Sequence, residues 1–231
     1  MVSNYNKDFH SHILPAIDDG ASTVEESLIL LQKLKEQGVD TVVATPHFYL
    51  SQQRLDSFLQ NRKSAYRAIE EASENNNIPN IIMGAEVYYH PMLFSMENIA
   101  ELCIGNSPYM LLELPYGGLD KSIVAEVEKF INFTGFIPIL AHIEIYPPKI
   151  IERLMRLPLL GQINMTSFFD QKKGKVALKL VQKGYCHVLG TDCHNIKYRP
   201  PYFKRGLESF AASVDNRFVK QVEDTGIKIL G

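Results

Sequence analysis

The chain has 231 residues, 22% of them charged, and a formal net charge of −2, so we expect one globular domain over residues 1–231. Its Lys and Arg residues are dispersed, which argues against a nucleic-acid partner. Residues 1–8 are polar, unlike a signal peptide, and no apolar run approaches the ~20 residues of a membrane span. Three cysteines are too few for a disulfide framework. We expect a cytoplasmic protein that does not insert into a membrane. The sequence does not indicate its oligomeric state.

Short apolar runs alternate with helical patterns along the chain. The runs are apolar at most positions, as in strands that are buried on both faces of a parallel sheet. The expected strands are the segment up to His10, then 40–45, 80–85, 109–114, 136–141, 161–165 and 186–190. The expected helices are 24–37, 53–75, 121–133, 148–157, 175–183, 201–212 and 216–224, before a short apolar end at 227–230.

Seven strands that alternate with helices predict an α/β fold, a distorted TIM-like (β/α)7 barrel, either complete or incomplete. A doubly wound open sheet is the alternative. In a barrel every strand ends at one shared rim, whereas an open sheet builds its site at one switch point. Nearly every expected strand here delivers an acid or a histidine at or just past its end, which favours the barrel.

The residues that could carry chemistry begin with His10-Ser11-His12. Side chains alternate along a strand, so both imidazoles lie on the same side. Asp192-Cys193-His194 repeats this spacing near the other end of the chain, and single acids and histidines follow the strands between them. The nine candidate metal ligands are His10, His12, Asp19, His47, Glu86, Glu113, His142, Asp192 and His194.

Five imidazoles with four carboxylates suit Mn²⁺, Fe or Zn²⁺ better than Mg²⁺ or Ca²⁺, which prefer oxygen ligands. Nine ligands are too many for one ion and fit two or three divalent ions, for which Mn²⁺ is our first choice and Mg²⁺ stays possible. Ions roughly 3.5–4 Å apart can clamp an attacking hydroxide and a phosphoryl oxygen. The pattern predicts a metal-dependent hydrolase.

Arg199 follows the Asp192-x-His194 pair, and its guanidinium can bind a phosphate with two hydrogen bonds. Cys193 and Arg199 also form Cys-x5-Arg, the loop signature of cysteine-dependent tyrosine phosphatases. The intervening residues include no glycine, and Cys193 lies between two expected ligands, so we do not assign a thiol nucleophile. Tyr88, close after Glu86, is a candidate for the wall of a substrate pocket.

Six segments, taken in order, resemble one family over almost the whole chain. The segments are His-Ser-His-Ile-Leu-Pro at 10–15 with Asp-Asp-Gly at 18–20, Ala-Thr-Pro-His at 44–47, Gly-Ala-Glu-Val-Tyr-Tyr at 84–89, Leu-Glu-Leu at 112–114, Ala-His-Ile-Glu at 141–144, and Thr-Asp-Cys-His-Asn at 191–195 with Arg-Pro-Pro at 199–201. The chain resembles the polymerase-and-histidinol-phosphatase (PHP) superfamily. Within it, the chain is most similar to the bacterial metal-dependent protein-tyrosine phosphatases of capsule and exopolysaccharide biosynthesis clusters.

The resemblance implies a PHP-fold barrel with three metal ions. It assigns His10, His12, Glu86 and Asp192 to one ion, Glu86, Glu113 and His142 to the second, and Asp19, His47 and His194 to the third. It implies a phosphate contact by Arg199 and a phosphotyrosine protein as partner, the autophosphorylated tyrosine kinase that controls polysaccharide export. With it, we assign Arg199, Glu113 and Asp192 to catalysis and Arg199 and Tyr88 to substrate binding.

One position departs from the family pattern, which usually has an Arg that binds phosphate where this chain has Ile145. Lys149, Lys197 or a nearby tyrosine are candidates to compensate. The predicted function is a metal-dependent phosphomonoesterase, a protein-tyrosine phosphatase that works by metal-hydroxide attack on phosphorus. The alternatives are a small-molecule phosphatase of the histidinol-phosphatase type and a metal-binding regulatory module with weakened catalysis.

Overall fold

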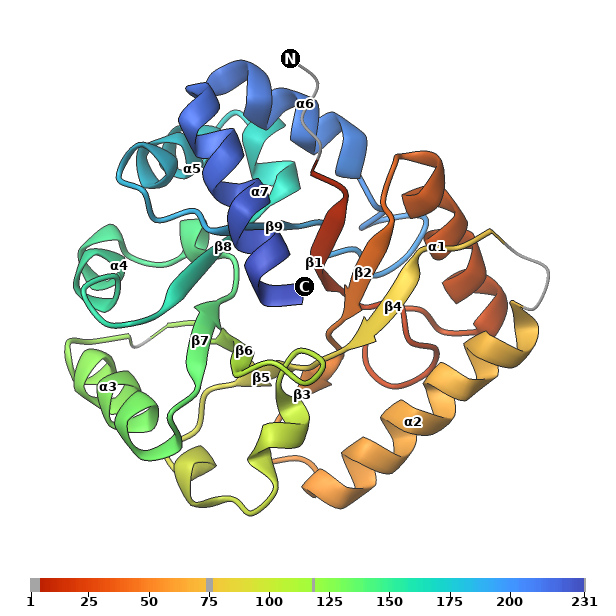
Figure 1. Ribbon diagram of the computed structural model, residues 1–231. Helices are drawn as coiled ribbons and strands as arrows, with labels where there is room; N and C mark the ends of the chain where they lie inside the picture. Colours follow the sequence, from red (N-terminus) through yellow and green to blue (C-terminus); the bar gives the residue numbers. More distant parts are fainter. Residues whose placement is uncertain (1–4, 74–76, 118, 231) are drawn as a thin grey trace.

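Strands and helices alternate along the chain, with the strands in the centre and the helices outside them (Figure 1). The computed structural model describes residues 5–73, 77–117 and 119–230. The strands are β1 (Lys7–Ser11), β2 (Thr41–Ala44), β3 (His47–Phe48), β4 (Asn80–Met83), β5 (Glu86–Tyr88), β6 (Tyr109–Glu113), β7 (Ile137–Leu140), β8 (Leu160–Asn164) and β9 (Val188–Gly190).

In the described residues, seven α-helices connect or follow these strands, and four short 3₁₀ turns lie between them. The α-helices are α1 (Val24–Glu36), α2 (Leu55–Ala72), α3 (Ser122–Thr134), α4 (Pro148–Leu154), α5 (Lys173–Gln182), α6 (Phe203–Ser213) and α7 (Asn216–Leu230). The 3₁₀ turns are η1 (Leu93–Ser95), η2 (Ile99–Leu102), η3 (Ile143–Ile145) and η4 (Met165–Phe169).

All strand pairs are parallel, and their spatial order follows the chain. One sheet has the order β1-β2-β4 and the other the order β3-β5-β6-β7-β8-β9. At the far edge, β1 is bridged to the segment after β9: Ser11 and Cys193 form a parallel bridge, and the amide of His12 donates to the carbonyl of Cys193 at 2.8 Å. This order confirms a curled parallel α/β sheet and shows that the doubly wound alternative is wrong, since that fold reverses its strand order.

Two of the expected strands end one or two residues early, and each is followed by a second short strand beyond its expected bounds. The segment 40–45 ends at Ala44 and resumes as β3 after Pro46, which has no amide hydrogen for a ladder. The segment 80–85 ends at Met83 and resumes as β5. Gly84 donates its amide hydrogen to the carbonyl of Ala44, and Glu86 donates to the carbonyl of Pro46, so both strands bend together. The bend carries His47 and Glu86 into the same register position.

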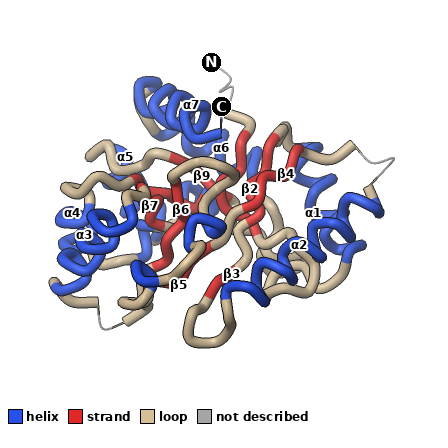
Figure 2. The backbone as a smooth tube through the Cα atoms, turned by 60° about the horizontal axis from the view of Figure 1, so that its bottom comes forward, coloured by secondary structure: helices blue, strands red, loops and turns tan. Residues whose placement is uncertain are grey.

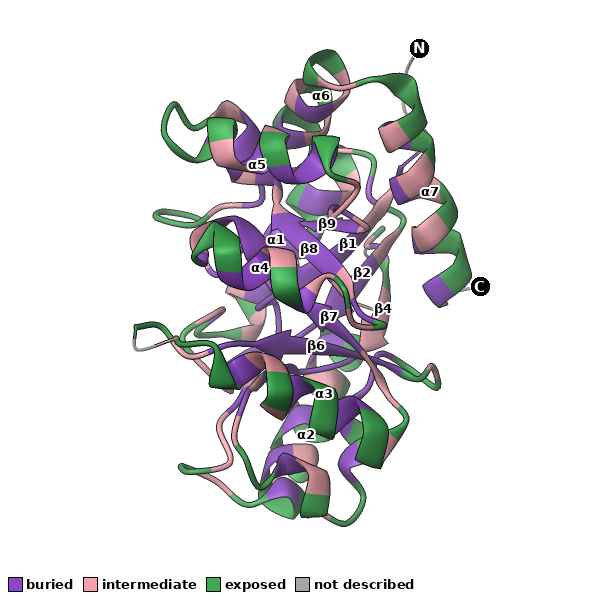
Figure 3. Cartoon of the chain, turned by 90° about the vertical axis from the view of Figure 1, so that its left-hand side faces the viewer, coloured by how far each residue is buried: buried purple, intermediate pink, exposed green. Residues whose placement is uncertain are grey.

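The strands are largely buried, and the helices around them carry both buried and exposed residues (Figure 3). The buried core is rich in Leu, Ile, Val and Phe. All five residues of β6 are buried, which is why its sequence shows no alternation. In the view of Figure 2, helices flank the strands on both sides. No helix of the described ranges is both long and apolar enough to cross a bilayer.

The last helix differs most from the expected boundaries. We expected a helix over 216–224 and a separate apolar end, but α7 continues to Leu230. Val219, Val222 and Ile229 are buried along one face. Gly226 lets this face approach β1, since a Cβ there would lie 3.3 Å from the ring of Phe9. Residues 74 and 75 of the expected second helix lie outside the described residues, and α2 ends at Ala72.

Gly161 in β8 allows a close approach that a larger residue would prevent. A Cβ at this position would overlap the carbonyl oxygen of Tyr185 and lie 2.7 Å from Cδ1 of Ile143. We predict that Gly161→Ala lowers the free energy of unfolding by about 1–3 kcal/mol, measured by urea denaturation, because the overlap must be relieved by backbone movement. Gln60→Ala on the exposed face of α2 is the control, with an expected change within about 0.5 kcal/mol. Equal effects would contradict the prediction.

Candidate metal centre

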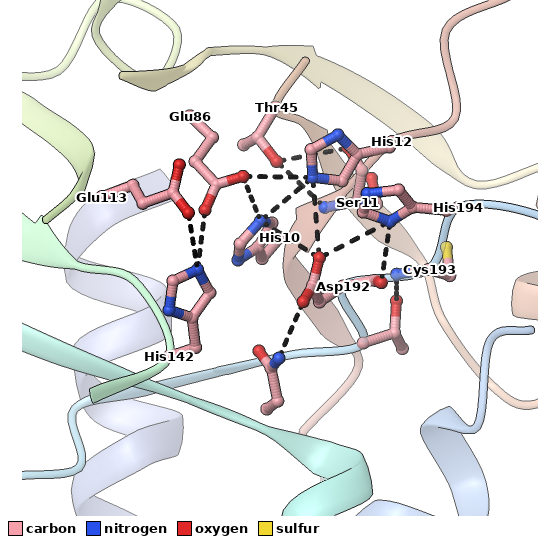
Figure 4. Close-up of polar contacts among 12 residues, drawn as sticks. His10, Ser11, His12, Thr45, Glu86, Glu113, His142, Asp192, Cys193 and His194 are labelled. Carbon is pink, nitrogen blue, oxygen red and sulfur yellow. Dashed lines mark hydrogen bonds and ion pairs between the residues drawn. The ribbon is translucent and has the colours of Figure 1, made fainter. Parts of the chain in front are cut away.

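The nine predicted ligands lie together at the carboxyl ends of the strands, and Figure 4 shows most of them pointing toward one another. They come from seven separate parts of the chain. His10 belongs to β1, His47 to β3, Glu86 to β5 and Glu113 to β6, while His12, Asp19, His142, Asp192 and His194 follow strands directly or in the next loop. Parallel strands bring their carboxyl ends to one rim, which explains how residues so distant in sequence meet.

The Glu86 carboxylate lies at the middle of the cluster and is 1% exposed. Its Oε2 atom lies 3.1 Å from Nε2 of His10, 3.3 Å from Nε2 of His12 and 3.1 Å from Nδ1 of His47. Its Oε1 atom lies 3.0 Å from Nε2 of His142. One carboxylate therefore contacts four imidazoles, and this geometry suits a ligand shared between two cations.

Asp192 is the second acid near the two histidines of β1. Its Oδ1 atom lies 3.5 Å from Nε2 of His10 and 3.6 Å from Nε2 of His12. The same oxygen lies 3.6 Å from Nδ1 of His194. The Nε2 atoms of His10 and His12 are themselves 3.2 Å apart. Two imidazole nitrogens and a carboxylate oxygen thus converge on one point.

Asp19 and Glu113 lie on opposite sides of His47. Oδ1 of Asp19 lies 3.5 Å from Nε2 of His47 and 3.4 Å from Nε2 of His194. Oε2 of Glu113 lies 3.9 Å from Nδ1 of His47, and its Oε1 lies 3.7 Å from Nε2 of His142. His47 can therefore offer its two ring nitrogens to different parts of the cluster.

Three groups have potential ligand atoms that all lie within 4.8 Å of one another. The groups are His12, Asp19, His47 and His194; His10, His12 and Asp192; and His47, Glu86 and Glu113. They differ from the sets implied by the resemblance in three ways. Glu86 is absent from the group of His10, His12 and Asp192; His12 joins the Asp19 group; and His47 takes the place of His142 beside Glu86 and Glu113. His142 still faces both of these acids through Nε2.

The donor set fits divalent cations. Nδ1 of His47, Oε2 of Glu113 and Nδ1 of His142 are buried without a hydrogen-bond partner in the structure. Buried polar atoms are normally paired, so such atoms need an explanation. A mixture of imidazole nitrogen and carboxylate oxygen is what first-row transition ions prefer. The atoms that make no hydrogen bond at the rim are therefore of the kinds that a metal ion would satisfy.

The charges in the cluster depend on one another. Burial alone would raise the pKa of Glu86, but the charges and hydrogen bonds of His10, His12 and His142 hold it well below its usual range. Burial works against protonation of His10, yet Glu86 and Asp192 raise the pKa of His10 to about 9. Burial and the neighbouring Glu86 charge raise the pKa of Glu113 to about 7. Cations would have to displace the histidine protons, which couples binding to pH.

Asp18 supports the cluster, although sequence reasoning selected only its neighbour Asp19. Oδ2 of Asp18 lies 2.7 Å from Nδ1 of His12 and accepts the backbone N–H of His47 at 3.0 Å. Oδ1 accepts the backbone N–H of Gly20. A carboxylate on the far nitrogen of a histidine fixes its tautomer and orientation. The signal in the sequence was the first acid of the Asp-Asp-Gly segment at 18–20.

Two amides of β8 also hold site residues, and sequence reasoning missed both. Oε1 of Gln162 lies 3.2 Å from Nδ1 of His10 and accepts the backbone N–H of His142 at 2.7 Å. Nδ2 of Asn164 donates to Oδ2 of Asp192 at 2.8 Å. The spacing of two puts both amides on one face of the strand, and polar residues there within an apolar run were the available signal.

Two of the nine residues adopt left-handed backbone conformations. His142 has φ 34° and Asp192 has φ 53°. For non-glycine residues this region costs of the order of 1–3 kcal/mol, and His and Asp tolerate it better than most. Both residues come just after a strand, and the turn redirects each side chain to the rim.

Cys193 and Arg199 do not form a thiolate site. Cys193 is fully buried, and burial raises the pKa of its thiol. Nη2 of Arg199 lies 2.7 Å from Oδ2 of Asp192, and Nη1 lies 2.7 Å from Nε2 of His194. The guanidinium therefore belongs to the ligand cluster, while the thiol is buried next to it.

A pocket of about 450 Å³ adjoins the cluster, lined in part by His142, Asp192 and Arg199. Ile145 also lines it. Of the residues expected to compensate for Ile145, neither Lys149 nor Lys197 lines this pocket, but tyrosines do. Tyr88 is not among the residues that line this pocket. Its ring centroid lies 5.2 Å from that of Tyr49, whose ring lies 5.2 Å from that of His47.

Comparison with known proteins places this site in context. The chain is 28% identical to the tyrosine-protein phosphatase CpsB of Streptococcus pneumoniae, over 93% of each chain. It is 26% identical to the tyrosine-protein phosphatase YwqE of Bacillus subtilis, over 83% of this chain and 78% of the relative.

Solved structures share the fold. One from a study of YwqE and CpsB, described there as metal-dependent tyrosine phosphatases, has a TM-score of 0.81 at 21% identity and covers 94% of this chain and 91% of the other. The phosphotriesterase homology protein of Escherichia coli has a TM-score of 0.59 at 11% identity and covers both chains fully. Residues 6–226 match the family model for capsular polysaccharide synthesis, CpsB/CapC, and the chain therefore belongs to this family.

Proposed function

We propose that this protein is a metal-dependent phosphomonoesterase and specifically a protein-tyrosine phosphatase. The observation that carries the proposal is the Glu86-centred cluster of histidines and acids beside a pocket that Arg199 lines. Membership of the CpsB/CapC family supports it, as do relatives that are named tyrosine-protein phosphatases.

We further propose that the fold is the distorted (β/α)7 barrel of the PHP superfamily. Two observations support this assignment. If β2 with β3 and β4 with β5 each count as one bent strand, the sheet has seven strands. The bridge between Ser11 and Cys193 brings the first strand next to the segment after the last one.

The residues that would hold two or three divalent ions, with Mn²⁺ as our first choice, are His10, His12, Asp19, His47, Glu86, Glu113, His142, Asp192 and His194. Their mixed nitrogen and oxygen donors and the buried unpaired atoms support this assignment. Bound divalent ions would supply Lewis-acid activation of water and would stabilise charge on the phosphoryl oxygens.

The other groups of the chain have defined tasks in this proposal. Arg199 binds the phosphoryl oxygens with its planar guanidinium, which lies next to the cluster. Asp192 holds Arg199 through Oδ2 and faces His10 through Oδ1, so it links the phosphate contact to the ligands. Glu113 lies at the rim with one oxygen unpaired. A phenolate leaving group has a conjugate acid with a pKa near 10, so it needs limited protonation.

The substrate in this proposal is phosphotyrosine on the autophosphorylated tyrosine kinase that controls polysaccharide export, and the encounter takes place in the cytoplasm. Support comes from the family description, which names capsular polysaccharide synthesis, and from relatives named tyrosine-protein phosphatases.

Removal of metal tests the proposal directly. We predict that chelation lowers hydrolysis of a phosphotyrosine peptide by about a hundredfold or more, because Lewis-acid stabilisation contributes several kcal/mol. Addition of Mn²⁺ should restore the rate. The measurement is phosphate release beside elemental analysis of the same sample. Undiminished turnover in protein shown to be free of metal would rule out this mechanism.

Cys193→Ser separates the metal mechanism from a thiolate mechanism. We predict a turnover within about twofold of wild type, because the thiol is buried and its raised pKa keeps it protonated. Arg199→Ala, measured alongside, should lower kcat/KM by about a hundredfold, since it removes a donor to the phosphoryl group. Loss of turnover in a folded serine variant would instead identify Cys193 as the nucleophile.

Asp18→Asn tests how the cluster is supported. We predict a fall in metal affinity of about 10- to 100-fold, because the carboxylate orients His12. The measurement is titration of chelator-treated protein with Mn²⁺, monitored by calorimetry. Asp224→Asn on the exposed side of α7 is the matched control and should bind like wild type. If both variants bind equally, Asp18 does not orient a ligand.

A further inference from the structure

The pocket beside the cluster has two cationic side chains in its walls, Arg199 and Lys173. Asp192 is the only acid among its lining residues that the structure describes, and Ile145 makes one wall apolar. A phosphate monoester carries a charge of about −1.5 to −2 at neutral pH. The charges of the pocket therefore suit a phosphate. Lys173 is neither one of the nine candidate ligands nor a partner of Arg199 in the contacts described above.

Arg199 cannot supply all of the positive charge. Its guanidinium is already paired with Asp192 at 2.7 Å and contacts His194 at 2.7 Å. Lys173, in contrast, is exposed, and no ion pair or side-chain hydrogen bond of its ammonium occurs within the described ranges. Backbone hydrogen bonds lower the pKa of the exposed Asp170, and the charge of Lys173 adds to this effect. Because Asp170 is exposed and forms no ion pair with Lys173, water screens their attraction, and the ammonium stays available to a ligand.

The backbone under Lys173 is held in place. Lys173 is the first residue of α5, and Oδ1 of Asp170 accepts the backbone N–H groups of Lys172 and Lys173, both at 2.8 Å. A Cβ at Gly174 would lie 3.2 Å from the carbonyl oxygen of Ser167, so the start of α5 packs closely on η4. Only the lysine side chain needs to order when a ligand binds.

We infer that Lys173 is a substrate-binding residue that contacts the phosphate of the ester held in this pocket, and that it supplies the positive charge that Ile145 does not. This inference rests on the proposed phosphatase function. Lys172 provides the comparison within the chain, because it has the same charge and the same helix start but does not line the pocket.

The test compares wild type with Lys173→Gln, Lys173→Arg and Lys172→Gln in the metal-loaded protein. For Lys173→Gln we expect KM for phosphotyrosine and for 4-nitrophenyl phosphate to rise about three- to tenfold, as for one exposed charge-assisted hydrogen bond, with kcat nearly unchanged. Lys173→Arg should restore KM, and Lys172→Gln should match wild type. The KM of Lys173→Gln should also depend less on salt, because one charge is removed.

A second readout does not require turnover. Calorimetric titration with inorganic phosphate should show a weaker affinity for Lys173→Gln by the same factor as the rise in KM. Ile145→Arg combined with Lys173→Gln should recover the affinity, because the arginine would add a charge to the same pocket. Melting temperatures of all variants would show whether they fold equally.

Three outcomes would overturn the inference: equal KM and phosphate affinity in the Gln variants at 172 and 173, no recovery with Lys173→Arg, or an effect seen only with peptides that carry acidic flanking residues. The last outcome would assign Lys173 to the peptide and not to the phosphate. If the wild-type, metal-loaded protein hydrolyses no phosphate ester, the proposed function fails, and phosphate affinity alone still decides the role of Lys173.

Discussion

Burial of opposite charges at one end of the sheet is the constraint on which the rest of this structure depends. Glu86, Asp192, His10 and His12 are almost completely buried, and an isolated charge in such a position would cost several kcal/mol. Each carboxylate faces imidazoles at 3.0–3.6 Å, so the desolvation is offset only while the whole group stays together. The same mutual dependence that keeps the charges buried also produces a concentrated set of metal donors.

The fold meets this constraint with a second layer of polar groups. Asp18, Gln162 and Asn164 bind the far sides of the histidines and acids and so fix their orientation. These contacts leave the inner atoms of the cluster facing one another. Such an arrangement resists collapse, because each inner side chain is held from behind, and it explains why buried polar atoms remain available for cations.

The pocket next to the cluster combines the charges of the site with an open surface. Tyr116, Tyr198 and Tyr202 are exposed large side chains that all line it. Their rings offer apolar area for an aromatic group, while Arg199 and Lys173 offer positive charge. An aryl phosphate needs both of these properties, and the pocket provides them on different walls.

The order of the elements and the members of the cluster could be predicted from the sequence. Alternation of apolar runs with helical patterns predicted the order of strands and helices, and the position of each acid or histidine after a strand predicted that nine side chains would meet. The prediction of the cluster succeeded because parallel strands end at one rim. Applying this rule requires only the position of each residue relative to the end of its own strand. The bends at Pro46 and Gly84 and the length of α7 depend on packing against distant segments. The local sequence pattern therefore did not predict them.

The residues that support the cluster and those that line the pocket became evident from the three-dimensional packing of the chain. Gln162 and Asn164 look like ordinary polar positions of a strand until His10 and Asp192 lie beside them. Lys173 and Lys172 are equivalent in sequence, and the packing of α5 on η4 brings only Lys173 to the pocket. The physical reason is that a hydrogen bond or a charge contact depends on distances of a few ångströms between segments that the chain separates by many residues.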